Sequence, residues 1–311
     1  MTRLKRWLRR IGIVLAVLVV LVTIASFAYN TATDGRETSA GSLYAGPYVV
    51  ADGTSIAYRR WGTTGTPIVL LGGFVEPSWV WQGVGSLLGR THRVFALDLP
   101  PFGYTQRRGP FTLAHWVELV RAFDAKLGVR RPVLVGHSLG AAVAVASALA
   151  RPRAVAGIVL LDGDALPVGG GGRWLSHLLV NPYYTSIFRI VTGSDWLVGR
   201  VLQGALAPHA GKPPRAQLEL WERQFRVRGT ANAFRHLFAG GSSGVSSDDL
   251  QHVRTPSLVV WGEHDTVDAV DAGRQTARAL GAQFVLVRGA GHLSMLGRPV
   301  AVARAIERVA R

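Results

Sequence analysis

The sequence predicts an α/β fold in which a mostly parallel sheet of eight strands is flanked by helices and preceded by one N-terminal transmembrane helix. Three observations lead to this prediction. Short apolar runs of strand length alternate with longer helical stretches along the chain. The runs are apolar throughout, as in strands that helices cover on both faces. An uninterrupted hydrophobic segment follows a cluster of basic residues near the N-terminus.

The N-terminal segment has the composition of a membrane anchor. Residues 1–10 are rich in arginine, and residues 11–28 are apolar apart from Thr23 and Ser26. A helix over residues 11–29 is about 28 Å long, which is close to the hydrocarbon thickness of a bilayer. The positive-inside rule places the basic end in the cytoplasm and the rest of the chain outside. We therefore predict a single-pass signal-anchor helix in the cell membrane.

A cleavable signal peptide is the alternative for this segment. Ser26-Phe27-Ala28 resembles a small-x-small cleavage site, and cleavage near Ala28 would give a secreted protein. The hydrophobic run exceeds the about 7–15 residues of a signal-peptide core, which favours an uncleaved anchor. No cysteine follows the run, so a lipoprotein is excluded. Residues 30–44 are small and polar, and they predict a flexible stalk.

The composition limits the classes of function. The chain has 311 residues, of which 48% are hydrophobic, enough for one large domain over residues 45–311. The absence of cysteine excludes disulfides, thiolate catalysis and cysteine-ligated metals. The net charge of +16 comes without a nucleic-acid-binding motif, so we expect a basic surface that favours anionic lipid headgroups. We expect no metal, no organic cofactor, no nucleic acid and no obligate protein partner.

The predicted elements follow one another in α/β order. A hairpin turn at Asp52-Gly53 joins the first two strands. The interval between the sixth and seventh strands holds glycine-rich turns and amphipathic pieces, and it predicts a helical insertion over the sheet at about 165–247. Strands are expected at 48–50, 55–61, 67–71, 93–97, 132–135, 157–161, 257–261 and 283–287. Helices are expected at 79–88, 113–127, 139–150, 267–280 and 299–309.

The segment Gly136-His137-Ser138-Leu139-Gly140 matches the pattern G-x-S-x-G. A predicted strand precedes it and a helix of small residues follows it, which is the strand–turn–helix setting of a nucleophile elbow. Gly136 and Gly140 permit a cramped turn that raises the hydroxyl of Ser138 above the sheet, where residue 138 must tolerate a strained backbone. The sequence predicts Ser138 as a nucleophile, with a serine in an ordinary glycine-rich turn as the alternative.

A serine hydroxyl needs a base, and the base needs a carboxylate to orient it. Among nine histidines, His292 directly follows the last predicted strand, where the base is expected. His137 and His264 are expected near the site without that role. Asp265 follows the penultimate strand and completes the chain order serine, acid, histidine. The competing acids are Glu263, Asp268 and Asp271, with Asp162 and Asp164 as more distant alternatives.

Two backbone N–H groups are expected to hold the oxyanion of a tetrahedral intermediate. One belongs to Leu139, at the start of the helix after the nucleophile. The other belongs to Phe74 in Gly72-Gly73-Phe74, a loop in which the glycines permit close backbone approach.

Together these residues resemble the α/β-hydrolase superfamily, in the branch with epoxide hydrolases, cofactor-free haloperoxidases, carbon–carbon hydrolases and lipid esterases. The resemblance covers about residues 46–309 and includes the segment Asp98-Leu99-Pro100-Pro101-Phe102-Gly103-Tyr104. It implies that the insertion is a cap that shapes the substrate pocket. Two positions depart from the family pattern, because Gly72 replaces a usual histidine and Pro101 replaces a common glycine. Ser138 in place of aspartate argues against epoxide hydrolase and haloalkane dehalogenase chemistry.

The resemblance and the predicted triad imply a serine hydrolase that cleaves a lipophilic carboxylic ester, thioester or lactone through an acyl-enzyme. An anchored domain with an apolar, aromatic-bearing cap is suited to such substrates. A carbon–carbon hydrolase or a perhydrolase/haloperoxidase-like enzyme with the same triad is an alternative. A non-catalytic ligand-binding protein on a hydrolase fold is an alternative of another class.

Overall fold

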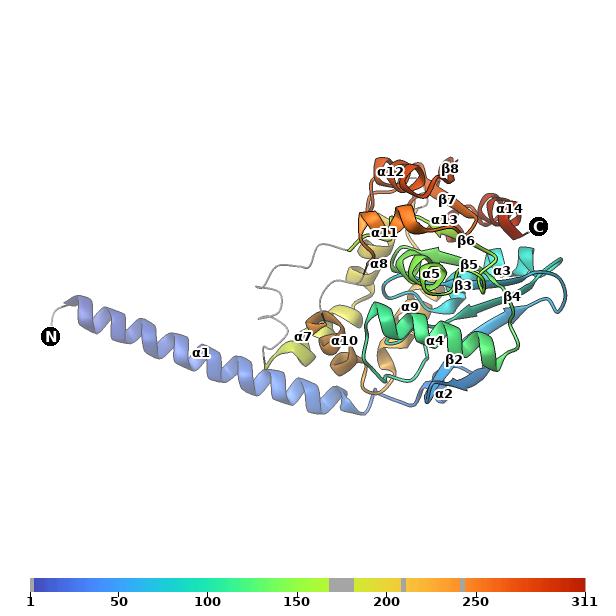
Figure 1. Ribbon diagram of the computed structural model, residues 1–311. Helices are drawn as coiled ribbons and strands as arrows, with labels where there is room; N and C mark the ends of the chain where they lie inside the picture. The colour runs from blue at the N-terminus through green and yellow to red at the C-terminus, as the bar shows by residue number, and fades with distance from the viewer. Residues whose placement is uncertain (1–2, 168–181, 208–210, 241–243, 311) are drawn as a thin grey trace.

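An eight-stranded sheet forms the centre of the computed structural model, which describes residues 3–167, 182–207, 211–240 and 244–310 (Figure 1). The strand order is β1-β2-β4-β3-β5-β6-β7-β8. The first two strands pair antiparallel, β2 pairs antiparallel with β4, and the remaining pairs are parallel. The strands are β1 (Tyr48–Ala51), β2 (Thr54–Trp61), β3 (Pro67–Leu71), β4 (Arg93–Leu97), β5 (Val133–His137), β6 (Gly157–Leu161), β7 (Ser257–Gly262) and β8 (Gln283–Val287).

This sheet confirms the predicted α/β class and the eight predicted strands. The first turn is the expected hairpin, because Asp52 and Gly53 both have positive φ angles, of 48° and 67°. The strand β5 runs two residues beyond its predicted end. Gly136 pairs with Leu71 of β3, and His137 pairs with Leu161 of β6. These pairings come from neighbouring strands, so the local sequence did not reveal them.

Helices cover both faces of the sheet and enclose two separate cores. On β3, Ile68 and Leu70 point to one face and Val69 and Leu71 to the other. All four side chains are fully buried, and each contributes about 1.5–3 kcal/mol to folding. One face carries η1 (Ser78–Trp81), α3 (Gln82–Leu88), α13 (Ser294–Gly297) and α14 (Pro299–Ala310). The other carries α4 (Leu113–Lys126), α5 (Leu139–Ala150), α11 (Ser247–His252) and α12 (Val270–Leu280).

The interval predicted as a helical insertion follows β6. Its described helices are α7 (Tyr184–Thr192), α8 (Asp195–Ala205), α9 (Arg215–Arg223), η2 (Gln224–Arg226) and α10 (Thr230–Ala239). Three parts of the predicted insertion, residues 168–181, 208–210 and 241–243, lie outside the described residues. We refer to these helices as the cap.

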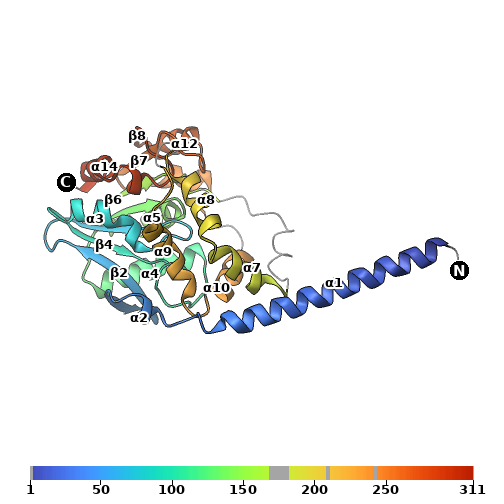
Figure 2. The same ribbon diagram turned by 180° about the vertical axis from the view of Figure 1, so that it is seen from behind.

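The long helix α1 (Arg3–Asp34) projects from the domain, and both views show the cap helices on the side from which it leaves (Figures 1 and 2). It is the one helix among the described residues that is long and apolar enough to cross a membrane. None of its most apolar 18-residue window is buried against the other described residues.

The flexible stalk predicted for residues 30–44 is wrong. The helix α1 continues to Asp34, and a short helix α2 (Ala40–Leu43) follows it. Thr38 exchanges two backbone hydrogen bonds with Arg226 and Arg228 of the cap, with N···O distances of 2.9 Å. Tyr44 stacks on Tyr104 with ring centroids 5.0 Å apart. The partners are far away in sequence, so a small polar segment without periodicity gave no sign of them.

Two helical glycines provide a matched test of the packing at the start of α5. A Cβ at Gly140 would lie 2.4 Å from the carbonyl oxygen of Leu71, whereas a Cβ at Gly204 would meet nothing within 4 Å. We expect Gly140→Ala to lower the free energy of unfolding by about 1–3 kcal/mol, because β3 must move away. We expect Gly204→Ala to raise it by about 0.5–1 kcal/mol through helix propensity. Urea unfolding followed by circular dichroism measures both, and equal effects would contradict this packing.

Candidate active site

Ser138 lies in the turn between β5 and α5 with a strained backbone. Its φ and ψ angles are 49° and −119°, as predicted for an elbow residue, and such a conformation costs about 1–3 kcal/mol. Crowding explains the glycines around it. A Cβ at Gly136 would lie 2.1 Å from the carbonyl oxygen of Gly140. A Cβ at Gly163, a position that the sequence did not single out, would lie 2.6 Å from the carbonyl oxygen of Ser138. The turn therefore presents a half-buried serine at the end of the sheet.

His292 and Asp265 are joined by a hydrogen bond. The His292 Nδ1 atom lies 2.9 Å from the Asp265 Oδ2 atom, and the Asp265 side chain is fully buried. The other oxygen of Asp265 accepts the backbone N–H groups of Val267 and Asp268 at 2.9 and 3.0 Å. With the carboxylate ionised, Nδ1–H donates and Nε2 keeps its lone pair. This tautomer is the one that a general base requires.

The competing carboxylates have other partners. Glu263 accepts the backbone N–H of Gly289, and Asp271 pairs with Arg274. Asp162 is fully buried and accepts hydrogen bonds from the Gly262 backbone and the Ser294 hydroxyl. Asp164 accepts the backbone N–H of Leu166. Asp268 differs from these acids, because its backbone N–H donates to Asp265 and its carboxylate interacts electrostatically with His292. Burial raises the pKa of Asp268.

The glycine loop after β3 lies directly against the nucleophile. A Cβ at Gly73 would lie 2.9 Å from the Ser138 Cβ atom, so only glycine fits there without displacement. The next residue is Phe74, whose ring is 46% exposed and packs edge-on against Phe102 with centroids 5.4 Å apart. Leu139 is the first residue of α5. The two expected oxyanion donors, Phe74 and Leu139, thus lie on the two segments that flank Ser138.

His137 anchors a buried network beneath this loop that the sequence did not predict. Its Nδ1 atom lies 2.8 Å from the Glu76 carboxylate, and its Nε2 atom lies 2.8 Å from the backbone oxygen of His292. Glu76 also accepts the N–H of Gly73 at 2.6 Å. Both imidazole nitrogens face oxygen atoms, an arrangement that favours a proton on each nitrogen. The network therefore connects the loop of the expected oxyanion donor Phe74, the elbow and the loop of the expected base.

The charges in this network shift two pKa values. Burial opposes the charge on His137, but Glu76, Asp162 and the His292 carbonyl outweigh it and raise the pKa of His137 to about 9. Burial raises the pKa of Asp162 to about 7, although His137 and the hydrogen bonds from Ser294 and Gly262 act against this rise. Glu76 was missed because a single carboxylate in the apolar stretch after Gly72-Gly73 carries no motif. Its position three residues after Gly73 was the available signal.

Titration of His137 predicts a loss of stability at alkaline pH. The pKa of His137 rises from 6.5 in the unfolded chain to about 9 in the folded one. The charge on His137 therefore contributes fully to the free energy of unfolding below pH 6.5. The contribution falls as the pH rises through 9. We expect the stability advantage of wild type over His137→Gln to shrink by on the order of 3 kcal/mol between pH 6 and 10.

Urea unfolding at several pH values measures this difference. The control is His252→Gln, which changes an exposed histidine on α11. Its curve should run parallel to that of wild type. A His137→Gln curve that also stays parallel would show that His137 is not charged in the folded protein.

The chain belongs to the alpha/beta hydrolase family, whose model matches residues 68–305. An uncharacterized hydrolase of Bacillus subtilis (strain 168), YugF, is 24% identical over 257 residues, which cover 80% of this chain and 91% of that protein. A membrane phospholipase A of known structure superposes with a TM-score of 0.69 at 23% identity, covering 98% of this chain and 97% of that one.

The meta-cleavage product hydrolase CumD of Pseudomonas fluorescens IP01 superposes with a TM-score of 0.71 at 18% identity, covering 85% of this chain and 97% of the other. Likeness to these two structures at such identities shows the fold. With the family match, it identifies the chain as an enzyme of the α/β-hydrolase superfamily. Relatives within the superfamily cleave different bonds, so the reaction must be argued from the site.

Proposed function

We propose that this protein is a serine hydrolase that cleaves an ester-type bond through an acyl-enzyme. The observation that carries the proposal is the hydrogen bond of 2.9 Å between His292 and Asp265, which orients a base for the serine in the strained elbow. The Asp265 side chain is buried and accepts three N–H groups, so it is held as an acceptor and fixes the histidine tautomer.

In the proposed reaction, Nε2 of His292 takes the proton of the Ser138 hydroxyl as its oxygen attacks the ester carbonyl carbon. The backbone N–H groups of Phe74 and Leu139 stabilise the resulting oxyanion. The imidazolium then donates its proton to the leaving alcohol, and the carbon–oxygen bond breaks to give the acyl-enzyme. Water, activated by the same histidine, attacks the acyl group and releases the acid and Ser138.

A lipophilic carboxylic ester, thioester or lactone is the proposed substrate class. Its support is the apolar helix α1, together with the aromatic side chains near the expected oxyanion loop. The ring of Phe74 contacts Phe102, Phe234 and Phe238 at centroid distances of 5.4, 6.0 and 5.7 Å. Phe74 directly follows Gly73, which lies against Ser138, so we propose that this cluster lines the acyl site, where an acyl chain is favoured over a charged group. The likeness in fold to a membrane phospholipase A further supports the proposal of a lipophilic substrate.

A chain-length series of p-nitrophenyl esters tests the substrate class on the full chain in detergent micelles. We expect kcat/KM to rise from acetate to octanoate, because about 0.8 kcal/mol is gained for each methylene that leaves water. Ser138→Ala serves as the background control. Much faster turnover of acetate than of octanoate would contradict the lipophilic class. Turnover of a vinylogous 1,5-diketone, with no ester cleaved, would indicate a carbon–carbon hydrolase.

A further inference from the structure

The polar residues within the apolar part of α1 contact the cap helix α7. Thr23 and Ser26 are the two polar residues among residues 11–28. The Thr23 hydroxyl lies 2.8 Å from the hydroxyl of Tyr183, and the Ser26 hydroxyl is hydrogen-bonded to that of Ser186. Residues three apart lie on one side of a helix, so this side of α1 faces α7. Polar pairs of this kind hold helices together where apolar side chains supply little specificity.

Arg189 fixes the same contact at the C-terminal end of α1. Its guanidinium donates to the Asn30 carbonyl at 2.8 Å and to the Thr33 hydroxyl at 3.0 Å. It also pairs with Asp34 at 3.0 Å and Glu37 at 2.6 Å. The Arg189 side chain is only 13% exposed, so these charged hydrogen bonds are partly shielded from water. The cap helix α7 is therefore held on α1 in one register.

This register sets the depth of α7 relative to the apolar part of α1. Thr23 lies about 7.5 Å along the helix before Ala28, the last residue of the apolar segment. Because Tyr183 and Ser186 contact Thr23 and Ser26, the first turn of α7 is level with that segment. A helix at this level meets the boundary between headgroups and acyl chains of any bilayer that α1 spans.

The helix α7 has an apolar face that is exposed among the residues that the structure describes. Phe188 points into the cap, with its ring centroid 5.3 Å from that of Phe234, and Ser186 and Arg189 face α1. A third face carries apolar side chains with helical spacing that are 45–52% exposed, namely Ile187, Ile190 and Val191.

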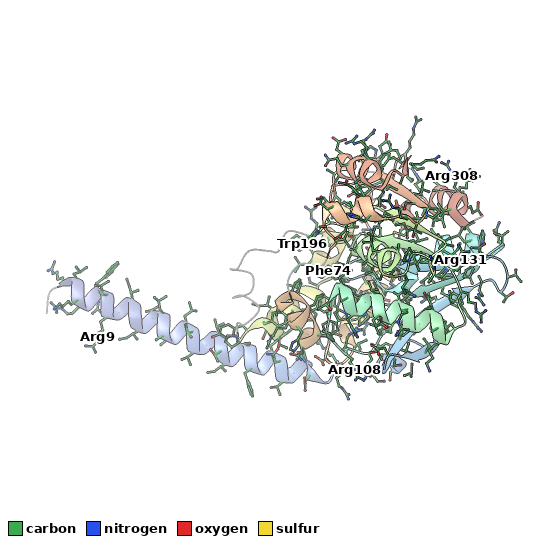
Figure 3. All side chains as sticks on the ribbon, viewed as in Figure 1. Arg9, Phe74, Arg108, Arg131, Trp196 and Arg308 are labelled. Carbon is green, nitrogen blue, oxygen red and sulfur yellow. The ribbon has the colours of Figure 1, made fainter. Side chains whose placement is uncertain are left out.

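The neighbouring helix α8 continues this exposed apolar region. Trp196 is 71% exposed and Val201 is 73% exposed. Figure 3 shows Trp196 on the side of the domain from which α1 projects, whereas Arg131 and Arg308 lie toward the opposite side. Tryptophan is enriched at the headgroup level of membrane proteins because its ring is amphipathic. Of the labelled arginines of the domain, Arg131 and Arg308 thus lie on the side away from Trp196, whereas Arg108 lies near the end of α1.

We propose that the cap docks on the membrane in which α1 is anchored, through the apolar side chains of α7 and α8. The docking surface consists of Ile187, Ile190, Val191, Trp196 and Val201. The occupant is the lipid leaflet. Lipid covers the fully exposed apolar window of α1, and α7 is held at the level of that window, so the same lipid reaches α7. The proposal rests on the proposed function and on a retained anchor, and it names that leaflet as the source of the lipophilic ester.

Spin labelling tests the docking surface directly, because the chain has no cysteine and a single introduced cysteine reports on one position. Ile190→Cys and Trp196→Cys probe the surface in the full chain, reconstituted in vesicles of phosphatidylethanolamine and phosphatidylglycerol. Val300→Cys is the matched control, since Val300 is 50% exposed on α14. Power-saturation spectroscopy compares collision with lipid-soluble oxygen and with an aqueous nickel chelate. We expect a several-fold higher oxygen-to-nickel ratio at positions 190 and 196 than at position 300.

The proposal fails if labels at 190 and 196 meet the nickel chelate as readily as the label at 300. It also fails if dipolar broadening shows a second copy against this surface, or if mass spectrometry shows that α1 has been removed. Adding Arg189→Gln should lower the ratio at position 190, whereas Arg215→Gln, on the exposed surface of α9, should not. Fluorophosphonate labelling of the same vesicles distinguishes failure of the docking proposal from failure of the proposed function. Labelling of the serine without lipid contact at positions 190 and 196 would reject only the docking proposal.

Discussion

Ser138→Ala is expected to lower kcat for an activated ester by about 10⁴–10⁶-fold, because the nucleophile and the acyl-enzyme are lost together. Residual turnover should come from the oxyanion donors and substrate binding, which remain intact. The measurement is steady-state hydrolysis of p-nitrophenyl octanoate by the full chain in micelles. The strained backbone at position 138 belongs to the turn, so we expect Ser138→Ala to fold.

The matched control for this substitution is Ser147→Ala, which removes a hydroxyl from the helix that follows the turn. Ser147 is fully buried in α5, away from the turn. Its removal should leave kcat within a factor of a few of wild type. If Ser138→Ala kept more than a tenth of wild-type activity in a folded protein, another group would be the nucleophile.

Asp265→Asn is expected to lower kcat by about 10⁴-fold with little change in KM. Its side-chain amide can donate to Nδ1 of His292, which favours the tautomer whose Nε2 carries a proton and cannot act as a base. The backbone hydrogen bonds from Val267 and Asp268 can still be accepted by the amide oxygen, so the loop should keep its shape. Ester hydrolysis at several substrate concentrations separates kcat from KM.

Asp271→Asn is the control, because Asp271 competed for this role in the sequence but pairs with Arg274 at the surface. It should behave as wild type. A loss of activity in Asp271→Asn that matched the loss in Asp265→Asn would mean that general electrostatics, and not the orientation of His292, explains the effect.

The sequence predicted the sheet and the chain order of the site because both depend on local patterns. Apolar runs such as 67–71 bury both faces of a strand, and β3 begins and ends at those residues. The elbow was predictable because a cramped turn requires glycine at 136 and 140, which a pentapeptide reveals. The proximity of Asp265 to His292 followed from the fold, since the ends of neighbouring parallel strands meet at one edge.

What the sequence did not predict depends on contacts between distant segments. Glu76, His137 and Asp162 come from three loops or strands, and no local spacing relates them. Residues 30–44 lacked an apolar period, yet Glu37 and Thr38 are bound by the cap. The polar pairs between α1 and α7 could not be predicted either, because they also join distant segments. In addition, a serine such as Ser26 in an apolar run fits a signal-peptide cleavage site.

Labelling with a fluorescent fluorophosphonate, with the adduct mapped by mass spectrometry, tests the central claim most directly. The reagent reacts with a serine only where a base and oxyanion donors activate it. We predict one adduct on Ser138 in the wild-type chain and none in Ser138→Ala or His292→Ala. An adduct on another residue, or no adduct on a folded wild-type chain, would contradict an activated Ser138.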